Sequence, residues 1–267
     1  MNLAHISVIA SDLDDTLLRK DGTISDATLA LFRRWEDTGN RLIIATGRPP
    51  RSARSGLPPG LAHLPLICYN GAVAFENGET VFEEYIPGAT VKSIVQRLLA
   101  RAPLARIGLE IHDQLYLNQT PPRALAGYTV VDLATVYHQP TAKIILRHSQ
   151  ADLLGDALDD LPDSVQIMVS NRYDLIQIMP RRVNKANALA AMVARWGLGL
   201  HNVISFGDDV NDVEMLQQSA IGVAVSNAVA EVLAAADHIT GTPEEDGVGM
   251  VVEKLLMENG KWRLEKF

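Results

Sequence analysis

Three carboxylates stand within four positions near the start of the sequence, at Asp12, Asp14 and Asp15. They follow a largely apolar run, residues 5–11, that is typical of a buried strand. Like charges about 4 Å apart repel by about 4 kcal/mol at an effective dielectric constant of roughly 20, so a positive group must offset this crowding. A hard divalent cation such as Mg²⁺, which takes oxygen ligands, would do so.

Other polar side chains come where further predicted strands end. Thr46 closes a strand over 41–47, and Asn70 closes one over 64–71. Four more follow the strand predicted over 202–207, namely Asp208, Asp209, Asn211 and Asp212. Because ligands of open parallel sheets bind beyond the carboxyl ends of the strands, these residues are expected to meet at one edge. Each of them alone could instead be a helix cap.

Lys185 stands at the start of a helix predicted over 184–197, directly after the expected cap Asn184. A cation at this end opposes the helix dipole and is locally unfavourable. Such a conflict indicates a functional constraint, because an ammonium at the sheet edge could hold both a carboxylate and a phosphate. A solvated surface lysine is the alternative.

The elements that must position these residues alternate between short apolar strands and amphipathic helices at both ends of the chain. This alternation predicts an α/β fold, a Rossmann-like three-layer core with a parallel sheet, built from residues 1–83 and 183–267. Residues 84–182 mix strands and helices without a strict repeat, which predicts an inserted α+β domain. A hairpin is expected over 72–85, with Asn77-Gly78 as its turn.

The bulk composition excludes several classes of protein. The chain has 267 residues, 47% of them hydrophobic, and a net charge of −8, so neither nucleic acid nor an anionic membrane is expected as a partner. Its one cysteine, Cys68, excludes an intramolecular disulfide and fits a reducing compartment. The absence of a recognisable signal or membrane segment leads us to expect a cytoplasmic protein. The sequence indicates no oligomeric state.

Four short segments together resemble a known family. They are "DLDDT" (12–16), "ATGR" (45–48), "NK" (184–185) and "GDDVND" (207–212). In order and spacing they resemble the four motifs of the phosphatases of the haloacid dehalogenase superfamily. The inserted segment and "YNGA" (69–72) resemble its Cof-type subfamily, whose insert is a cap domain. The chain departs from the common pattern at Asp15, Asp209 and Ala186, where glycine, asparagine and glycine are usual.

The resemblance implies a role for each matching residue. Asp12 is expected to be the nucleophile that attacks phosphorus, and Asp14 the acid for the leaving alcohol and then the base for water. Lys185 is expected to pair with the nucleophile and the phosphate. The expected ligands of Mg²⁺ are Asp12, the backbone carbonyl of Asp14, Asp208 and, in support, Asp212. The expected phosphate or substrate contacts are Thr46, Gly47, Arg48, Asn70 and Asn211.

Substrate selection is expected to depend on two further features. Arg48, Arg51 and Arg54 recur at intervals of three and could form a positive face that attracts anions, although the last two could equally lie on a solvated helix face. The inserted domain is expected to close over the site and select the leaving group. Its candidate polar contacts are Asn118, Arg147, Arg172 and Tyr173.

The function expected from this resemblance is a Mg²⁺-dependent phosphatase of small phosphate monoesters, which works through an aspartyl-phosphate. Sugar phosphates, or similar metabolites such as pyridoxal phosphate, are the expected substrates. A phosphomutase of related fold and a non-catalytic protein that binds a phosphate ligand are the alternatives. The presence of both Asp12 and Asp14 argues against the binding protein, because a pure binder has no need of an acid at position 14.

Overall fold

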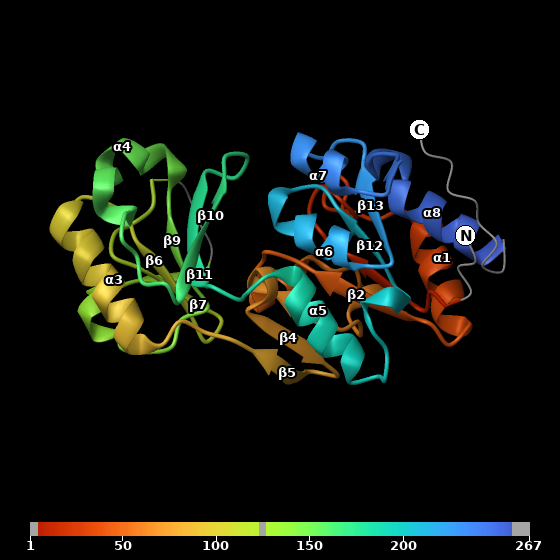
Figure 1. The fold of residues 1–267 in the computed structure, drawn as a ribbon, viewed down its shortest axis with the longest axis horizontal. Coiled ribbons are helices and arrows are strands. Elements are labelled where there is room, and N and C mark those ends of the chain that lie inside the picture. Colours follow the sequence, from red (N-terminus) through yellow and green to blue (C-terminus); the bar gives the residue numbers. More distant parts are fainter. Residues whose placement is uncertain (1–4, 123–126, 258–267) are drawn as a thin grey trace. The chain divides into compact units, whose positions relative to one another are not determined.

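The computed structural model describes residues 5–122 and 127–257. The chain forms two compact units, one built from both ends of the sequence and one from Glu84–Val183. Each unit has its own sheet (Figure 1), and each has its own apolar core.

An eight-stranded sheet forms the centre of the first unit, in the order β14-β13-β12-β1-β2-β3-β4-β5. Its strands are β1 Val8–Ser11, β2 Arg41–Ala45, β3 Leu66–Cys68, β4 Val73–Glu76, β5 Glu79–Glu83, β12 Val203–Gly207, β13 Ile221–Val225 and β14 His238–Thr240. The neighbours from β14 to β3 are parallel, and β4 and β5 add an antiparallel hairpin. The prediction of an α/β fold around a parallel sheet is therefore confirmed.

Helices cover both faces of this sheet. They are α1 Asp26–Asp37, α2 Pro50–Gly56, α5 Lys185–Ala194, α6 Val213–Gln218, α7 Ala230–Ala235 and α8 Gly247–Met257. On one face Leu189 of α5 and Met215 of α6 join a buried cluster with Val8 of β1 and Ile43 of β2. On the other face α1 packs against α8 and against β2, and Figure 1 shows the two helices side by side. Cover on both faces explains why β1 is buried at every position.

Local signals in the sequence place several of these elements. The side chain of Ser25 accepts a hydrogen bond from the Thr28 N–H at 3.0 Å and caps α1, and Gly39 ends it with a φ of +84°. The expected hairpin is present, since Asn77 and Gly78 join β4 to β5 with φ angles of 52° and 82°. Two consecutive positive φ angles are what the tight hairpin turn requires.

The second unit contains a six-stranded sheet in the order β10-β11-β9-β6-β7-β8. Its elements are α3 Gly88–Arg101, β6 Gly108–Ile111, β7 Gln114–Leu117, β8 Tyr128–Val130, β9 Lys143–Leu146, α4 Ala151–Leu154, β10 Val165–Ser170 and β11 Leu175–Pro180. Among the described strands of this second sheet, only β7 and β8 pair in parallel, and the other neighbours are antiparallel. Leu98 of α3 and Leu154 of α4 pack with Leu109 and Ile144 of the sheet.

The structure differs from the expected elements at three places. The strand expected over 64–71 ends at Cys68, and residues 69–71 form a turn instead. β8 and β14 were not expected, because three residues are too few to show a strand pattern. The sequence also predicts a short proline-led helix after the strand QLYLN, and residues 123–126 of that segment lie outside the described residues.

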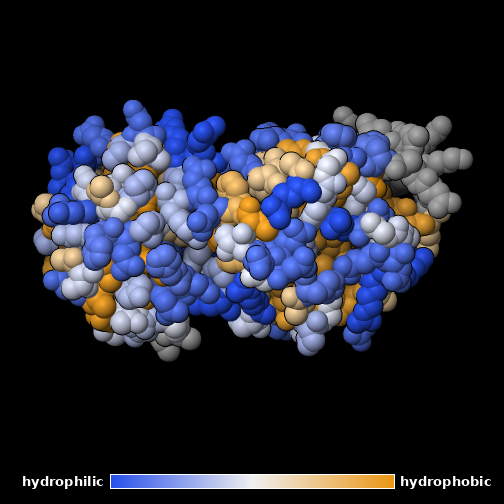
Figure 2. All heavy atoms as spheres, turned by 90° about the horizontal axis from the view of Figure 1, so that it is seen from below, coloured by the Kyte–Doolittle hydropathy of each residue, from blue (hydrophilic) through white to orange (hydrophobic). Residues whose placement is uncertain are grey.

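The face drawn in Figure 2 is mainly polar. Hydrophilic residues cover most of it, with hydrophobic residues in smaller areas between them. The interior contains fully buried apolar side chains such as Ile9, Ile43 and Phe206. Among the helices of the described residues, none has both the length and the apolar character needed to cross a membrane.

Candidate active site

The polar residues that follow the strands of the first unit come to one edge of its sheet. Ser11 at the end of β1 lies beside Ile44 of β2 and Phe206 of β12. The next residue of the chain, Asp12, donates its backbone N–H to the Phe206 carbonyl at 3.0 Å. Asp208 follows β12 and Thr46 follows β2 along the same direction. Because β1, β2 and β12 are parallel neighbours, their polar continuations share the carboxyl edge.

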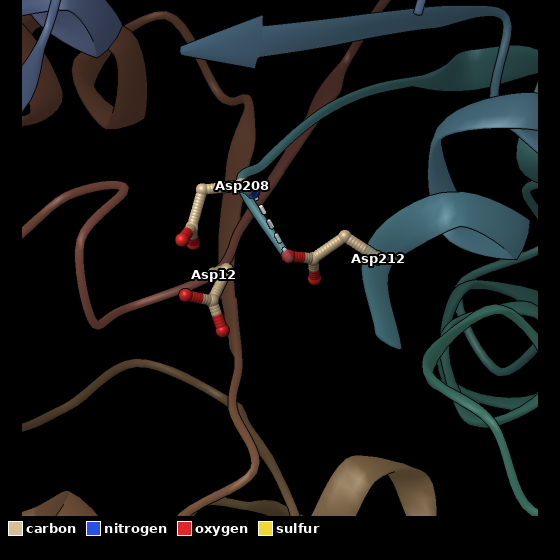
Figure 3. Close-up of side chains that lie close together, drawn as sticks. All are labelled: Asp12, Asp208 and Asp212. Carbon is tan, nitrogen blue, oxygen red and sulfur yellow. Dashed lines mark hydrogen bonds between the residues drawn. The ribbon is translucent and has the colours of Figure 1, made fainter. Parts of the chain in front are cut away.

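Three buried carboxylates and one buried ammonium form the first group at this edge. Asp12, Asp208 and Asp212 place one oxygen each within 4.8 Å of one another, and Figure 3 shows how their side chains gather. Lys185 donates from Nζ to Asp12 Oδ1 at 2.5 Å and to Asp212 Oδ1 at 2.6 Å. We call these four residues the carboxylate cluster.

Lys185 is not a surface lysine. Its side chain has no exposed area, and it leaves the first turn of α5, which Asn184 caps by accepting the Asn187 N–H at 2.7 Å. Burial alone would lower the pKa of Lys185, but the contacts with Asp12 and Asp212 outweigh it and raise the pKa above its ordinary value. The ammonium therefore stays charged beside the two carboxylates.

The carboxylates exceed the positive charge available within the cluster. Burial raises the pKa of Asp12 well above its ordinary value, because the attraction of Lys185 does not fully offset desolvation and the nearby charges of Asp212 and Asp208. If all three carboxylates are ionised, the cluster carries two negative charges more than the Lys185 ammonium balances. Carboxylate oxygens are the donors that a hard divalent cation prefers, so the residues present fit such an ion in both charge and chemistry.

Neighbouring residues fix the orientation of the carboxylates through hydrogen bonds and close packing. Asp212 Oδ2 accepts the backbone N–H groups of Asp208 at 3.0 Å and Asp209 at 3.2 Å. Thr16 donates its hydroxyl to Asp208 Oδ1 at 2.7 Å. Gly207 makes room, since a Cβ there would lie 2.4 Å from the Cβ of Asp212. Sequence reasoning gave Thr16 and Gly207 no role, although both lie within the quoted motifs.

A second, neutral group lies at the same edge, and we call Thr46, Gly47, Asn70 and Asn211 the amide cluster. Asn211 donates from Nδ2 to Asn70 Oδ1 at 2.8 Å. Thr46 and Asn70 are each 1% exposed. The hydroxyl and amide groups of the cluster offer hydrogen-bond donors without a net charge, which suits the oxygens of a phosphate.

Arg48 and Asp14 form a two-point ion pair. Arg48 Nε lies 2.7 Å from Asp14 Oδ2, and Nη2 lies 2.5 Å from Oδ1. Nη1 of the same arginine donates to the Ser52 carbonyl at 3.3 Å. Both side chains are partly exposed, and Asp14 is not one of the three carboxylates that gather in the cluster. The structure thus pairs Arg48 with the expected acid, and its phosphate contact stays a prediction.

The other two arginines of the expected positive face contact aromatic residues, one through the ring and one through the hydroxyl. Arg54 stacks over Phe75 at 4.5 Å from the ring centroid. Arg51 donates from Nη1 to the Tyr69 hydroxyl at 3.4 Å. The packing of Arg54 favours a structural role for that side chain.

The three departures from the common motif pattern have local explanations. Asp15 has a positive φ of 58°, which suits the glycine usual at this place and which aspartate tolerates better than most residues. Its carbonyl accepts the side-chain N–H of Asn227 at 2.8 Å. Asp209 accepts the Val210 N–H at 2.9 Å as a cap. Ala186 is fully buried in the apolar cluster under the sheet.

Comparison with known proteins places the chain in a family. A model of the family described as haloacid dehalogenase-like hydrolase matches residues 9–252. A 5-amino-6-(5-phospho-D-ribitylamino)uracil phosphatase of Bacillus subtilis, YitU, is 28% identical over 92% of this chain and 96% of its own length. The phosphatase of the same description from Escherichia coli, YbjI, is 25% identical over 94% of this chain and 96% of its own. The chain belongs to the haloacid dehalogenase-like hydrolases.

Solved structures share the fold of this chain over nearly its whole length. A crystal structure of a protein from Thermotoga maritima has a TM-score of 0.82 and 25% identity, and covers 93% of this chain and 97% of its own. A haloacid dehalogenase-like hydrolase from Bacteroides thetaiotaomicron has a TM-score of 0.80 and 24% identity, over 94% of this chain and 99% of its own. Within the family the chain is a phosphatase, a hydrolase of phosphate monoesters, as the motifs implied.

Proposed function

We propose that this chain is a Mg²⁺-dependent phosphatase of small phosphorylated metabolites, with Asp12 as nucleophile. The observation that carries the proposal is the carboxylate cluster, in which Asp12 is buried between Lys185 and two further carboxylates. A buried carboxylate held by an ammonium is oriented and poorly solvated, which suits nucleophilic attack. The relatives reported above are named phosphatases, which favours hydrolysis over the phosphomutase and binding-protein alternatives.

The expected metal site is Asp12, Asp208 and the Asp14 backbone carbonyl, with Asp212 in support. When bound there, Mg²⁺ would neutralise charge on the phosphoryl group. Its two positive charges match the excess negative charge of the carboxylate cluster. Its preference for a few carboxylates together with phosphate and water fits a cluster of three.

The reaction then follows from the groups of the chain. Asp12 attacks phosphorus while the bond from phosphorus to the leaving oxygen breaks, and Asp14 gives that oxygen a proton. Water then attacks the aspartyl-phosphate, Asp14 takes its proton, and Asp12 is released with inorganic phosphate. Lys185 holds Asp12 and stabilises the transferred phosphoryl oxygens. Thr46 and Asn211 donate hydrogen bonds to the phosphate.

The ion pair with Arg48 constrains how Asp14 can act. Both oxygens of Asp14 accept hydrogen bonds from the guanidinium. A carboxyl group that donates a proton needs one oxygen for that proton, so Asp14 must release one of its two contacts before it acts as an acid. Arg48 is therefore proposed to orient Asp14 through the oxygen that stays bound.

The proposed substrates are small phosphorylated metabolites such as sugar phosphates or pyridoxal phosphate. To these we add 5-amino-6-(5-phospho-D-ribitylamino)uracil, which appears in the names of the two relatives YitU and YbjI. The unit Glu84–Val183 is proposed to select the leaving group. Among its candidate contacts, the side chain of Asn118 stabilises the fold of this unit. It accepts a hydrogen bond from the Ile107 N–H and donates one to the Ala105 carbonyl. A cytoplasmic location stays a prediction.

The test is release of inorganic phosphate from a panel of phosphate monoesters, with Mg²⁺ and with EDTA. We expect release that depends on the metal, and a ranking that shows which leaving groups are recognised. No release from any member, in the presence of Mg²⁺, would contradict the proposal. Release only after addition of a bisphosphate activator would favour the phosphomutase instead.

A further inference from the structure

The turn between β3 and β4 has an uncommon backbone. Tyr69, Asn70 and Gly71 have positive φ angles of 53°, 58° and 106° in succession. Glycine adopts this region readily and asparagine tolerates it, but for other residues it costs about 1–2 kcal/mol. Such a conformation persists only where the surrounding structure fixes it, and it is common at functional sites.

Contacts on two sides hold this turn. The Tyr69 N–H donates to the Arg48 carbonyl at 3.0 Å, and the Asn70 N–H donates to the Thr46 carbonyl at 3.1 Å. A Cβ added to Gly71 would lie 2.2 Å from the Asn184 carbonyl oxygen, so no other residue fits there without movement. The turn is therefore packed between the loop after β2 and the start of α5.

The consequence of this conformation is the position of the Asn70 amide. The residue is 1% exposed, and its Oδ1 accepts the Asn211 Nδ2 at 2.8 Å. Gly47 lies against this pair, because a Cβ there would be 2.8 Å from Asn70 Oδ1 and 3.7 Å from Asn211 Nδ2. Residues from three separate loops thus fix the amide pair.

This contact decides how the Asn211 amide is oriented. Asn211 Oδ1 is buried and has no hydrogen-bond partner within residues 5–122 and 127–257. The two ends of an amide have nearly the same shape, but one donates hydrogen bonds and the other accepts them. A half turn of Asn211 would present an oxygen where a phosphate oxygen needs a donor. With Nδ2 held by Asn70, that half turn would bring two oxygens together and is disfavoured.

We propose that Asn70 is a positioning residue for phosphate binding. It holds Asn211 so that the second N–H of Nδ2 can donate to a phosphate oxygen beside Thr46 and Gly47. This rests on the proposed function, in which the amide cluster binds the phosphate. It also changes the role of Asn70, for which the family resemblance implies a direct contact.

The test compares two asparagines with the same backbone conformation. Asn70→Gly keeps a residue that accepts positive φ and removes the amide, and Asn77→Gly does the same in the hairpin turn, where φ is 52°. We expect Asn70→Gly to raise the inhibition constant of inorganic phosphate about tenfold and to lower kcat/KM for p-nitrophenyl phosphate about thirtyfold, while Asn77→Gly changes each by less than about twofold. Near-UV circular dichroism checks that both variants fold.

A double-mutant cycle with Asn211→Ala separates positioning from direct contact. If Asn70 acts through Asn211, adding Asn70→Gly to Asn211→Ala lowers kcat/KM by less than about twofold further. Losses that multiply would overturn the proposal, because they would show that Asn70 contacts substrate itself. Equal values for Asn70→Gly and Asn77→Gly would also overturn it. A wild-type chain that binds phosphate but hydrolyses no ester would refute the phosphatase alone, and the binding constants of the variants would still decide the role of Asn70.

Discussion

The carboxylate cluster and the amide cluster lie at the same sheet edge but are held in different ways. In the carboxylate cluster the side chains hold one another, since Lys185 contacts both Asp12 and Asp212. In the amide cluster the backbone positions the side chains. The turn with positive φ places Asn70, and Gly47 lets the chain pass close to the Asn70 amide. Charge balance is the constraint on the first, and the direction of hydrogen bonds is the constraint on the second.

This difference indicates how each cluster responds when one of its residues is substituted. A buried ionic group that loses one member leaves an uncompensated charge, so both stability and activity change. A neutral group that loses one member changes mainly the orientation of what remains. Variants in the carboxylate cluster should therefore have the larger effects, and a divalent cation should modify them.

The largest effect is expected for Asp12→Asn. The amide cannot attack phosphorus, so kcat should fall by at least about a thousandfold, because the covalent route is lost. Phosphate release from p-nitrophenyl phosphate measures it, with the exposed Asp37→Asn as control. An Asp12→Asn variant that retained a tenth of the wild-type rate would remove Asp12 from its proposed role.

Lys185→Met tests whether Lys185 balances the charge of the buried carboxylates in addition to its role in catalysis. It leaves Asp12 and Asp212 buried without their ammonium, so the free energy of unfolding in EDTA should fall by about 3–5 kcal/mol. Mg²⁺ should restore part of it, while kcat/KM stays about a hundredfold low. Urea unfolding with and without Mg²⁺ measures this, and Lys254→Met on the exposed side of α8 is the control. Equal losses with and without the metal would contradict the charge-balance account.

Substitution of two adjacent aspartates, Asp208 and Asp209, tests which of them binds the metal. Asp208 belongs to the carboxylate cluster, whereas the Asp209 side chain caps the turn that follows it. Asp208→Asn should raise the Mg²⁺ concentration for half-maximal activity by at least about tenfold, and Asp209→Asn by less than about threefold. Titration of activity with Mg²⁺, supported by the Mg²⁺ dependence of Tm, measures both. The reverse order would assign the metal to Asp209.

Arg48 follows the amide cluster in sequence but contacts Asp14, so its substitution tests whether it acts on the expected acid or on the phosphate. Arg48→Ala should lower kcat about tenfold for alkyl phosphates, whose leaving group needs a proton, and less than about threefold for p-nitrophenyl phosphate. Arg54→Ala, whose side chain stacks on Phe75, should stay within about twofold for both. An equal loss with both substrates would place Arg48 on the phosphate instead.

The sequence could predict the carboxylate cluster better than the amide cluster. Aspartate and lysine carry their chemistry in their residue type, so Asp12, Asp208 and Lys185 were candidates, although each taken alone could have been a helix cap or a surface lysine. The contact from Lys185 to Asp212 and the ion pair of Arg48 with Asp14 were not expected, because partner choice depends on side-chain direction. An apolar run that ends in Tyr69 reads as a strand, and nothing in its pattern shows that three residues turn left-handed.

The fold class was predicted because alternation of strands and helices is periodic over long segments. Short elements were missed where only three residues form a strand, as in β8 and β14. In those segments pairing with a neighbouring strand decides the conformation, and a partner distant in sequence leaves no local pattern.

The central strand pairing has a consequence for biosynthesis. β1 lies beside β12, with Val8 opposite Val203, so the two strands leave the ribosome far apart in time. At about 5–20 residues per second the interval is roughly 10–40 s. The continuous unit Glu84–Val183, which has its own apolar core, is synthesised within this interval and ends before β12 begins. We therefore expect the inserted unit to be able to fold before β1 and β12 pair, and Asp12 can meet Lys185 and Asp208 only after both have been synthesised.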